Sequence, residues 1–452
     1  MLEEIKELLE AKNYSSLRTK LETLEPVDIA ALFDEIPKEH ILLLFRILPK
    51  ITAAETFVEM DSDHQEMLIR SFNDTELKDV FDELFLDDTI DIIEEMPANV
   101  VSRIIRHSDM ETRKKINELL NYPKDSAGSI MTIEYVDLKK NMTVSEAINR
   151  IRTTGVDKET IYTCYVTGIH RKLQGLVSVK TLLLSPNDAL IEDIMETNII
   201  YSYTTDDKED VVNKINKYGF LAMPVVDKEK RLVGIVTVDD AIDVIQDETT
   251  EDIEIMAAMV PSDKPYLKTS AYEIWKNRIP WLLLLMVSAT FTGKIIVGFE
   301  NALQSCVILT TFIPMLMGTG GNAGGQSSVT VIRGLSIGEI EMKDIFRIIW
   351  KELRVSLLCG ITLAVANFIK MMLIDRSDII QSGQNFIIVS IVVSLSLLLA
   401  VIIAKLVGCI LPILAKKLHF DPAVMASPFI TTIVDACALI VYFNIAKSFL
   451  NI

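Results

Sequence analysis

The sequence predicts a multidomain protein whose C-terminal half lies in a membrane: an all-α helical-solenoid N domain, a repeated α/β unit, a connecting helix and a five-helix α transmembrane domain. Three observations predict this class. Residues 1–260 hold 52 of the 63 acidic residues in the chain of 452. Within that half, one stretch repeats every twelve residues and another repeats as an α/β unit, whereas the remainder contains long runs almost without charge. We therefore expect domains at 1–125, 126–246, 247–279 and 280–452.

The composition excludes several classes of protein. The acidic half has no basic face that could meet phosphates, so no nucleic-acid partner is expected, and its many Leu, Ile and Phe argue against disorder. The five Cys include no CxxC pair, which argues against a disulfide framework or a zinc site. The chain begins MLEEIKELLEAKNY, which is no secretory signal, so the N-terminal half should stay in the cytosol.

The N-terminal repeat places apolar residues in phase from residue 28 onward, each followed by a residue that stops or caps a helix. Pro37, Pro49, Asp61, Asn73 and Pro97 occupy that breaking position. Pro cannot continue a helix, and Asp and Asn are good caps, so the pattern predicts short stacked helices. Residues 51–100 hold 15 acidic and two basic residues. Such a surface is either simply solvated or a cation site.

Residues 126–246 read as two copies of one unit with the order strand, helix, strand, turn, strand, helix. The runs YTCYVT, GLVSV, AMPVVD and GIVTV have strand character. The two copies resemble a tandem pair of CBS (cystathionine β-synthase-type) domains, a regulatory module. In nucleotide-binding members a hydroxyl and an Asp three residues later hold the ribose. In the second copy Thr237 and Asp240 match that pattern, whereas in the first copy Ser178 has Thr181 in place of the Asp. The resemblance therefore leaves two alternatives: one site for an adenine nucleotide (ATP), or a purely structural pair.

An acidic stripe leads out of the second copy in VDDAIDVIQDETTEDIEIMAAM. On a helix, Asp240, Asp243, Asp247 and Glu251 share one face, and like charges at this spacing destabilise a helix by roughly 0.2–0.5 kcal/mol per pair. No Lys or Arg occurs from 232 to 263. The stripe is either a solvated face or a site for a hard divalent cation such as Mg²⁺ or Ca²⁺. After Pro261 and Pro265, residues 267–279 should form a helix that enters the membrane.

Five segments are long and apolar enough to cross a hydrocarbon core of about 30 Å. They are residues 281–299, 301–332, 355–374, 379–404 and 422–446. The basic residues before the first span, between the second and third, and before the fifth fall on one side if there are five spans. That side also holds the N-terminal half, so we expect a multi-pass cell-membrane protein with cytosolic N-terminal domains.

Two of these segments carry polar chemistry. The second contains MGTGGNAGGQSS, in which Gly permits a broken helix or close packing, while Asn322 and Gln326 suit a wet path. The fifth, SPFITTIVDACALIVYF, places Asp435 near its middle, where a charge costs at least about 2.5–3.5 kcal/mol. An oxygen-lined cation path explains Asp435, with Thr431 and Pro428 nearby. The simpler alternative is a structural bridge from Asp435 to Lys405 or Lys294.

The whole chain resembles the MgtE family of magnesium channels or transporters. The motifs PMLMGTGGNAGGQSS, FDPAVMASPFITTIVD and VTVDDAIDVIQDETTED carry the resemblance, and its four parts occur in the family's order. It implies a homodimer embedded in lipid, with the pore at the dimer interface and Asp435 binding the permeating ion. It implies regulatory Mg²⁺ positions in the cytosolic part, matched here by Asp207, Glu209, Asp240, Asp243, Glu248, Glu251 and Asp252, with Asp88 and Asp91 as further matches in the N domain.

Two residues depart from the family pattern. Gly219 stands where an acidic residue can occur, which puts a regulatory ion there in doubt. Ser427, before Pro428, stands where some relatives have Asn, which puts that pore contact in doubt.

The expected function is Mg²⁺ uptake down its electrochemical gradient, with cytosolic Mg²⁺ bridging the acidic surfaces to close the pore; no P-loop is present. Three alternatives compete with it. A CBS-regulated membrane enzyme lacks a catalytic constellation, because all five His fall outside the spans. A CBS-regulated anion transporter is disfavoured by Asp435 without an intramembrane Arg. A channel for Mn²⁺, Co²⁺ or Ca²⁺ stays open, since carboxylates suit several hard cations.

Overall fold

The computed structural model describes residues 2–262, 266–267 and 269–450, apart from the side chains of Asp157 and Ser427. Pro265 and residue 268, which belong to the expected entry into the membrane, lie outside these residues. The chain forms two compact units, Met1–Ile245 and Gln246–Ile452. Each is described separately.

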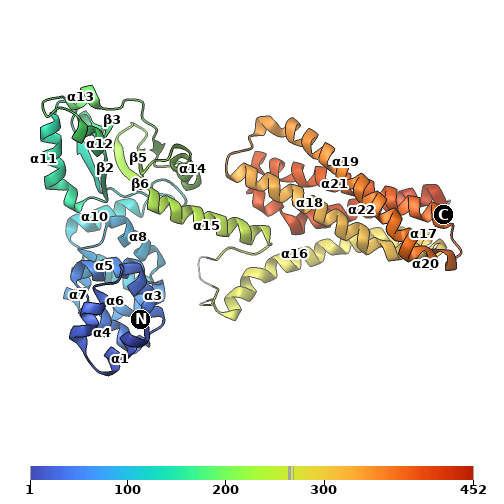
Figure 1. Ribbon diagram of the computed structural model, residues 1–452, viewed down its shortest axis with the longest axis horizontal. Coiled ribbons are helices and arrows are strands. Elements are labelled where there is room, and N and C mark those ends of the chain that lie inside the picture. The colour runs from blue at the N-terminus through green and yellow to red at the C-terminus, as the bar shows by residue number, and fades with distance from the viewer. Residues whose placement is uncertain (1, 263–265, 268, 451–452) are drawn as a thin grey trace. The chain divides into compact units, whose positions relative to one another are not determined.

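The first unit begins with a stack of short helices (Figure 1). They are α1 (Leu2–Glu10), α2 (Tyr14–Leu21), α3 (Pro26–Asp34), α4 (Lys38–Ile47), α5 (Lys50–Val58), α6 (Ser62–Ser71), α7 (Asp74–Phe81), α8 (Leu86–Glu95), α9 (Ala98–His107) and α10 (Met110–Leu119). The predicted breakers are the N-caps: Pro37, Pro49 and Pro97 precede α4, α5 and α9, and the carboxylate of Asp61 accepts a hydrogen bond from the third residue of α6. The solenoid prediction is confirmed.

The in-phase apolar residues of these helices form the core of the N domain. Phe45, Phe57 and Phe72 contact one another with ring centroids 5.3–6.2 Å apart. The same core continues into the α/β part through residues such as Met131 and Val211. The N domain and the second CBS copy therefore share one hydrophobic core, which fixes α8 against the α/β unit.

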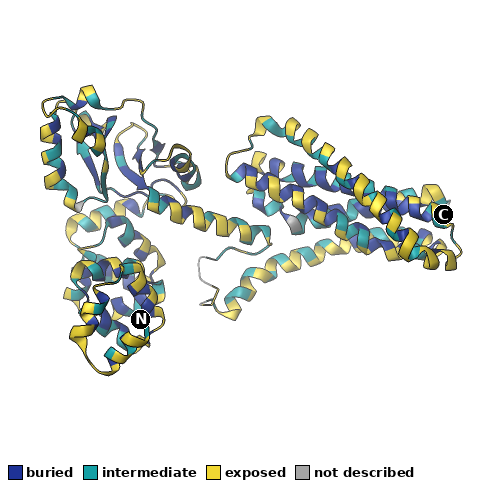
Figure 2. Ribbon diagram, in the orientation of Figure 1, coloured by how far each residue is buried: buried dark blue, intermediate teal, exposed yellow. Residues whose placement is uncertain are grey.

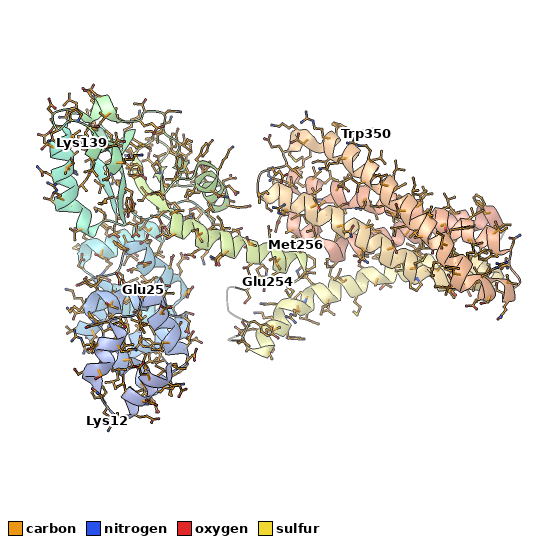
Figure 3. All side chains as sticks on the ribbon, in the orientation of Figure 1. Lys12, Glu25, Lys139, Glu254, Met256 and Trp350 are labelled. Atoms are coloured by element: carbon orange, nitrogen blue, oxygen red, sulfur yellow. The ribbon has the colours of Figure 1, made fainter. Side chains whose placement is uncertain are left out.

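The CBS pair follows with the predicted order of elements. The first copy contains β1 (Tyr135–Leu138), α11 (Val144–Thr154), β2 (Thr160–Thr167), β3 (Leu173–Ser178) and α12 (Val179–Leu184). The second contains α13 (Ile191–Ile194), β4 (Ser202–Tyr203), α14 (Lys208–Tyr218), β5 (Ala222–Val226), β6 (Leu232–Thr237) and α15 (Val238–Met256). Each sheet has three strands, the first pair parallel and the second antiparallel. In the first copy Lys139 pairs with Asp137 of β1 at 2.9 Å (Figure 3).

The connecting segment expected over 247–279 is not one helix. Its first part belongs to α15, which begins at Val238 directly after β6 and ends at Met256 (Figure 3). The next helix, α16 (Ala271–Gly298), begins with a capping box between Ser270 and Glu273. The start of α16 differs from the predicted residue 267 because Ser270 supplies the side-chain acceptor that a helix N-terminus needs.

The second unit is helical throughout. After α16 come α17 (Glu300–Ser305), α18 (Ile313–Ser336), α19 (Ile345–Lys370), α20 (Arg376–Gln381), α21 (Phe386–Lys417) and α22 (Ser427–Leu450), with the short 3-10 turn η6 (Pro422–Met425) before α22. The dark buried faces in Figure 2 lie mainly on α18 and α21, which form the centre of this bundle.

Four stretches of the described residues are both long and apolar enough to cross a membrane: Ala271–Gly298, Met342–Gln381, Phe386–Lys417 and Pro422–Leu450. The predicted second span, 301–332, is broken at Cys306 between α17 and a 3-10 segment. Its remainder is α18, whose 24 residues are long enough for a span at about 1.5 Å per residue. Glycine and polar residues make α18 less apolar than the others, so the count of five spans stays a prediction.

Candidate cation sites

Carboxylates from three parts of the first unit lie close enough together to raise one another's pKa values, and we call this group the acidic cleft. Asp87 and Asp88 lie in the first turn of α8, and Asp91 follows one turn later. Asp240 comes from the first turn of α15, and Glu159 immediately precedes β2. Glu134 ties the segments together, because its Oε2 accepts a hydrogen bond from the backbone N–H of Leu86 at 3.1 Å.

Burial and mutual repulsion raise the pKa values of five of these carboxyl groups, Asp87, Asp88, Asp91, Glu159 and Asp240. The pKa of Asp88 rises to about 8, chiefly because the carboxyl group is buried and further because of the charges of Asp87, Asp91 and Asp240. The same causes raise the pKa of Glu159 to about 8 and that of Asp91 to about 7. The pKa values of Asp87 and Asp240 rise to about 6. At neutral pH Asp88 and Glu159 therefore keep a proton unless a cation replaces it, whereas Asp87 and Asp240 are mostly ionised.

The donor set of this cleft fits a hard divalent cation. Oε2 of Glu159 is buried and has no hydrogen-bond partner. Within the described residues, no Lys or Arg forms an ion pair with Asp88, Asp91 or Glu159. An unsatisfied buried carboxylate oxygen facing other carboxylates is costly, and an ion with oxygen ligands such as Mg²⁺ removes that cost.

The hydroxyl and carboxylate expected at a nucleotide site lie together. The hydroxyl of Thr237 donates a hydrogen bond to Oδ2 of Asp240. In the first copy, the Ser178 hydroxyl instead caps α12 by accepting from the backbone N–H of Thr181 at 3.1 Å. Only the second copy keeps the ribose-binding pattern, and its Asp240 also faces the acidic cleft.

A second acidic group lies where the end of α15 meets the helical bundle. Oδ2 of Asp252 accepts a hydrogen bond from the Ser336 hydroxyl at 3.1 Å. Burial raises the pKa of Asp252, and the charges of Asp421 and Glu248 raise it further. Ile255 and Met256 pack against Ile332, Ala423 and Ala426 at the same place.

Sequence reasoning missed several members of these two groups. They are Glu134 and Glu159 in the cleft and Asp421 in the bundle. Asp421 lies inside the motif FDPAVMASPFITTIVD, so its position was a usable signal. No local pattern marks Glu134 or Glu159, and only the folded chain brings Glu134 to Asp88 and Glu159 to Asp240.

Other predicted regulatory residues lie elsewhere. Asp207 caps α14 by accepting a hydrogen bond from the backbone N–H of Glu209 at 2.9 Å. Asp243, Glu248 and Glu251 follow one another along α15, between Asp240 and Asp252. Gly219, the departure from the family pattern, has a φ of 65° and ends α14 as its C-cap. A left-handed residue favours glycine, which gives a local reason for its presence.

The glycine-rich face of α18 packs directly on α22 (Figure 1). A Cβ atom on Gly321 would lie 2.9 Å from Cγ2 of Thr431, and one on Gly324 would lie 2.9 Å from Cγ2 of Ile430. These glycines bring Thr431 against α18. The predicted role of glycine in close helix packing therefore holds at these positions.

Asp435 lies on α22 with Oδ1 buried and without a hydrogen-bond partner. The alternative of a bridge to Lys405 is not seen, since Lys405 donates to the Ser327 hydroxyl at 3.3 Å, which donates to Oε2 of Glu352 at 2.6 Å. Lys294 is exposed on α16. In the part of the chain that the structure describes, no basic side chain pairs with Asp435.

The remaining predicted pore residues separate into two places. Asn322 and Gln326 line a cavity of about 520 Å³ bounded by α18, α19 and α21, which also includes Lys405 and Cys359. The backbone carbonyl of Pro428 accepts a hydrogen bond from the Thr432 hydroxyl at 3.2 Å. The side chain of Ser427 lies outside the described residues. A single chain therefore places Asn322 and Gln326 on a different face of α18 from the glycines that contact α22.

Together, an apolar helical bundle, a tandem CBS unit and an acidic helical domain define a membrane-integral divalent-cation transporter rather than an enzyme. The family described as "MgtE: Divalent cation transporter" matches residues 313–445, the "MgtE intracellular N domain" matches residues 24–125, and the CBS domain matches residues 191–247. These matches also agree with soluble, intracellular N-terminal domains.

The relatives make the assignment more specific. The chain is 35% identical to the magnesium transporter MgtE of Thermus thermophilus, covering 99% of this chain and 98% of the relative. It is also 35% identical to the magnesium transporter MgtE of Bacillus subtilis, covering 98% of this chain and 96% of the relative. The cytosolic domain of the Mg²⁺ channel MgtE in complex with ATP is 35% identical, with a TM-score of 0.52, and covers 54% of this chain and 100% of that chain. This chain belongs to the MgtE family, and Mg²⁺ is the ion that the relatives support as its cargo.

Proposed function

We propose that the chain forms a homodimeric, Mg²⁺-selective channel that admits Mg²⁺ down its electrochemical gradient and is closed by cytosolic Mg²⁺. The observation that carries the regulatory part is the cleft of Asp88, Asp240 and Glu159, whose raised pKa values and unsatisfied oxygen require a cation or protons. Regulation by the transported ion itself follows from the same oxygen chemistry.

Gating follows from electrostatics. When cytosolic Mg²⁺ is low, the carboxylates of α8 and α15 repel one another, and the cleft opens. When Mg²⁺ is high, the ion bridges α8 to the start of α15, and a second ion near Asp252 and Asp421 holds the end of α15 on the bundle. Because α15 runs continuously from Val238 to Met256, both ions act on the same helix. To move the ratio of closed to open channel from 1:99 to 99:1, Mg²⁺ must bind the closed state more tightly by about 5.5 kcal/mol, which several weak sites can supply together.

Permeation depends on Asp435. A carboxylate inside an apolar helix, with one buried oxygen free, suits a dication that passes along an oxygen-lined path. Mg²⁺ gives up its water reluctantly, so Asp435 holds a hydrated ion, one carboxylate from each subunit. The homodimer supplies the second carboxylate, with Thr431 and Pro428 contributing further oxygens.

We also propose that an adenine nucleotide binds at Thr237 and Asp240. The ATP complex of the related cytosolic domain and the hydrogen bond between these two side chains support it. Because Asp240 faces other carboxylates, the triphosphate enters together with Mg²⁺. The two regulatory ligands then share one carboxylate.

The test is Mg²⁺ flux into liposomes that contain the full-length protein, with Mg²⁺ on the side of the soluble domains varied independently. The proposal expects flux at low Mg²⁺ on that side and closure as it rises, with Mg²⁺ passing in preference to Ca²⁺. Flux that ignores Mg²⁺ on the domain side would contradict the gating proposal. Equal flux of all four ions, Mg²⁺, Mn²⁺, Co²⁺ and Ca²⁺, would contradict the selectivity.

A further inference from the structure

A separate cluster of possible metal ligands lies in the N domain, away from the cleft carboxylates. Asp34 is the last residue of α3, Asp61 caps the N-terminus of α6, and His64 lies in the first turn of α6. One ligand atom from each of these side chains can be chosen so that all three lie within 4.8 Å of one another. Asp34 therefore comes from α3, whereas Asp61 and His64 come from the start of α6, two repeats further along the chain.

Both carboxylates converge on the same ring nitrogen. Nδ1 of His64 lies 2.9 Å from Oδ2 of Asp61 and 3.2 Å from Oδ1 of Asp34. A ring nitrogen carries at most one proton, so it can donate a full hydrogen bond to only one of the two. A dication at this point would satisfy both carboxylates and the nitrogen at once, because each would give it a lone pair.

The cluster is held in place by the fold. The other oxygen of Asp61, Oδ1, accepts a hydrogen bond from the backbone N–H of His64 at 2.8 Å, so the cap fixes the carboxylate beside the ring. The His64 side chain is 10% exposed and that of Asp61 is 18% exposed, whereas Asp34 is 48% exposed. Two ligands are thus preorganised, and the third closes from the solvent side, leaving room for water as a further ligand.

The ligand types separate this cluster from the acidic cleft. Imidazole nitrogen favours first-row transition metals, whereas Mg²⁺ and Ca²⁺ favour oxygen alone. Bound Zn²⁺ has ligand distances of about 2.0–2.2 Å, which the cluster reaches by small side-chain movements that draw Asp34 toward α6.

We propose that Asp34, Asp61 and His64 form a site for a transition-metal dication, Zn²⁺ in the first instance, that ties the end of α3 to the start of α6. The proposal is independent of the transport function, since none of the three residues lies in the cleft or the membrane bundle.

Calorimetry of Zn²⁺ binding to the detergent-solubilised full chain tests the site, with saturating Mg²⁺ present so that the oxygen-only sites are occupied. We expect one Zn²⁺ per chain in this condition and at least a tenfold loss of affinity in His64→Gln and in Asp34→Asn. The matched control is His107→Gln, because His107 contacts a single carboxylate, that of Asp74 at 3.4 Å. Its Zn²⁺ affinity should stay within a factor of two of the unchanged protein.

Two results would overturn the proposal. One is that the unchanged protein takes up no Zn²⁺ beside saturating Mg²⁺. The other is that His64→Gln and Asp34→Asn bind Zn²⁺ as the unchanged protein does. Asp34 is half exposed at a helix end, so Asp34→Asn keeps the fold and decides the matter even if His64→Gln does not fold. A Co²⁺-loaded sample adds a second readout, since its absorption bands report nitrogen ligation that is lost with His64.

Discussion

Gly408 of α21 lies directly against the backbone of Gly324 in α18, so closely that a Cβ atom on Gly408 would overlap the carbonyl oxygen of Gly324. A Cβ atom on Gly324 would lie 3.1 Å from the carbonyl oxygen of Ala404, also in α21, and 2.9 Å from Cγ2 of Ile430 in α22. The pair therefore sets how closely α18 can approach both α21 and α22. Small residues at such a crossing allow backbone contact that any side chain prevents.

Gly408→Ala should destabilise the bundle by about 1–3 kcal/mol, because the new methyl group meets backbone that cannot move away. Thermal unfolding of the detergent-solubilised protein measures this. Gly293→Ala in α16 is the matched control, since a Cβ atom there meets nothing within 4 Å. Equal melting temperatures for the two variants would show that the crossing is looser than described.

Asp435→Asn should reduce Mg²⁺ flux in liposomes at least about tenfold, because the amide keeps the shape but removes the charge that attracts a dication at membrane depth. Gel filtration checks that the protein still assembles as the unchanged protein does. Asp378→Asn, an exposed position in α20, serves as the control and should keep its flux. Normal flux through Asp435→Asn would remove this residue from the pore.

Asp88→Asn combined with Asp240→Asn should leave the channel conducting at high Mg²⁺, because the ion that bridges α8 and α15 loses two ligands. The measurement is flux against Mg²⁺ on the domain side, and its midpoint should rise by about tenfold or more, a change of about 1.4 kcal/mol in closing. Asp82→Asn with Glu83→Gln removes two exposed charges from the same acidic run. If this control shifts the midpoint as far, overall charge rather than the cleft governs closure.

The cleft should also respond to pH. Folding and assembly of the cleft raise the pKa of Asp88 and Glu159 from their ordinary values to about 8, so the assembled state binds more protons than the separated one. Its stability without Mg²⁺ is therefore greatest at low pH and falls as pH rises from about 4 to about 8. Because Mg²⁺ replaces those protons, the gain in melting temperature on adding Mg²⁺ should be larger at pH 8 than at pH 6. An equal gain in melting temperature at pH 6 and pH 8 would contradict the replacement of protons by Mg²⁺.

Asp421→Asn should weaken closure without affecting conduction. Its charge lies near Asp252 at the end of α15, and its Oδ1 also caps η6 by accepting from the backbone N–H of Ala423 at 2.7 Å. Asn keeps that cap and removes only the charge, so the midpoint for Mg²⁺ closure should rise severalfold while flux at low Mg²⁺ stays unchanged. A lower flux at low Mg²⁺ would indicate that the residue belongs to the conduction path instead.

Much of the architecture could be predicted because the signals are local. Pro49 and Asp61 stop or cap helices wherever they stand, and the β-branched and aromatic residues of GIVTV and YTCYVT are enough to predict a strand. The second span was harder, because glycine and polar residues in α18 dilute its apolar signal and Cys306 interrupts it. The helix that carries the acidic stripe was predicted, but the domain boundary expected at residue 247 falls inside it, because no breaker interrupts α15 between Val238 and Met256.

The class of protein, its order of parts and the place of Asp435 in an apolar segment follow from the sequence alone, because charge, periodicity and apolar length are properties of neighbouring residues. Which carboxylates meet can be seen only in the folded chain. Asp88, Glu159 and Asp240 come from three distant segments, and Asp34 reaches His64 across two repeats. Such groupings depend on how helices pack, and packing is set by the whole core rather than by any local pattern.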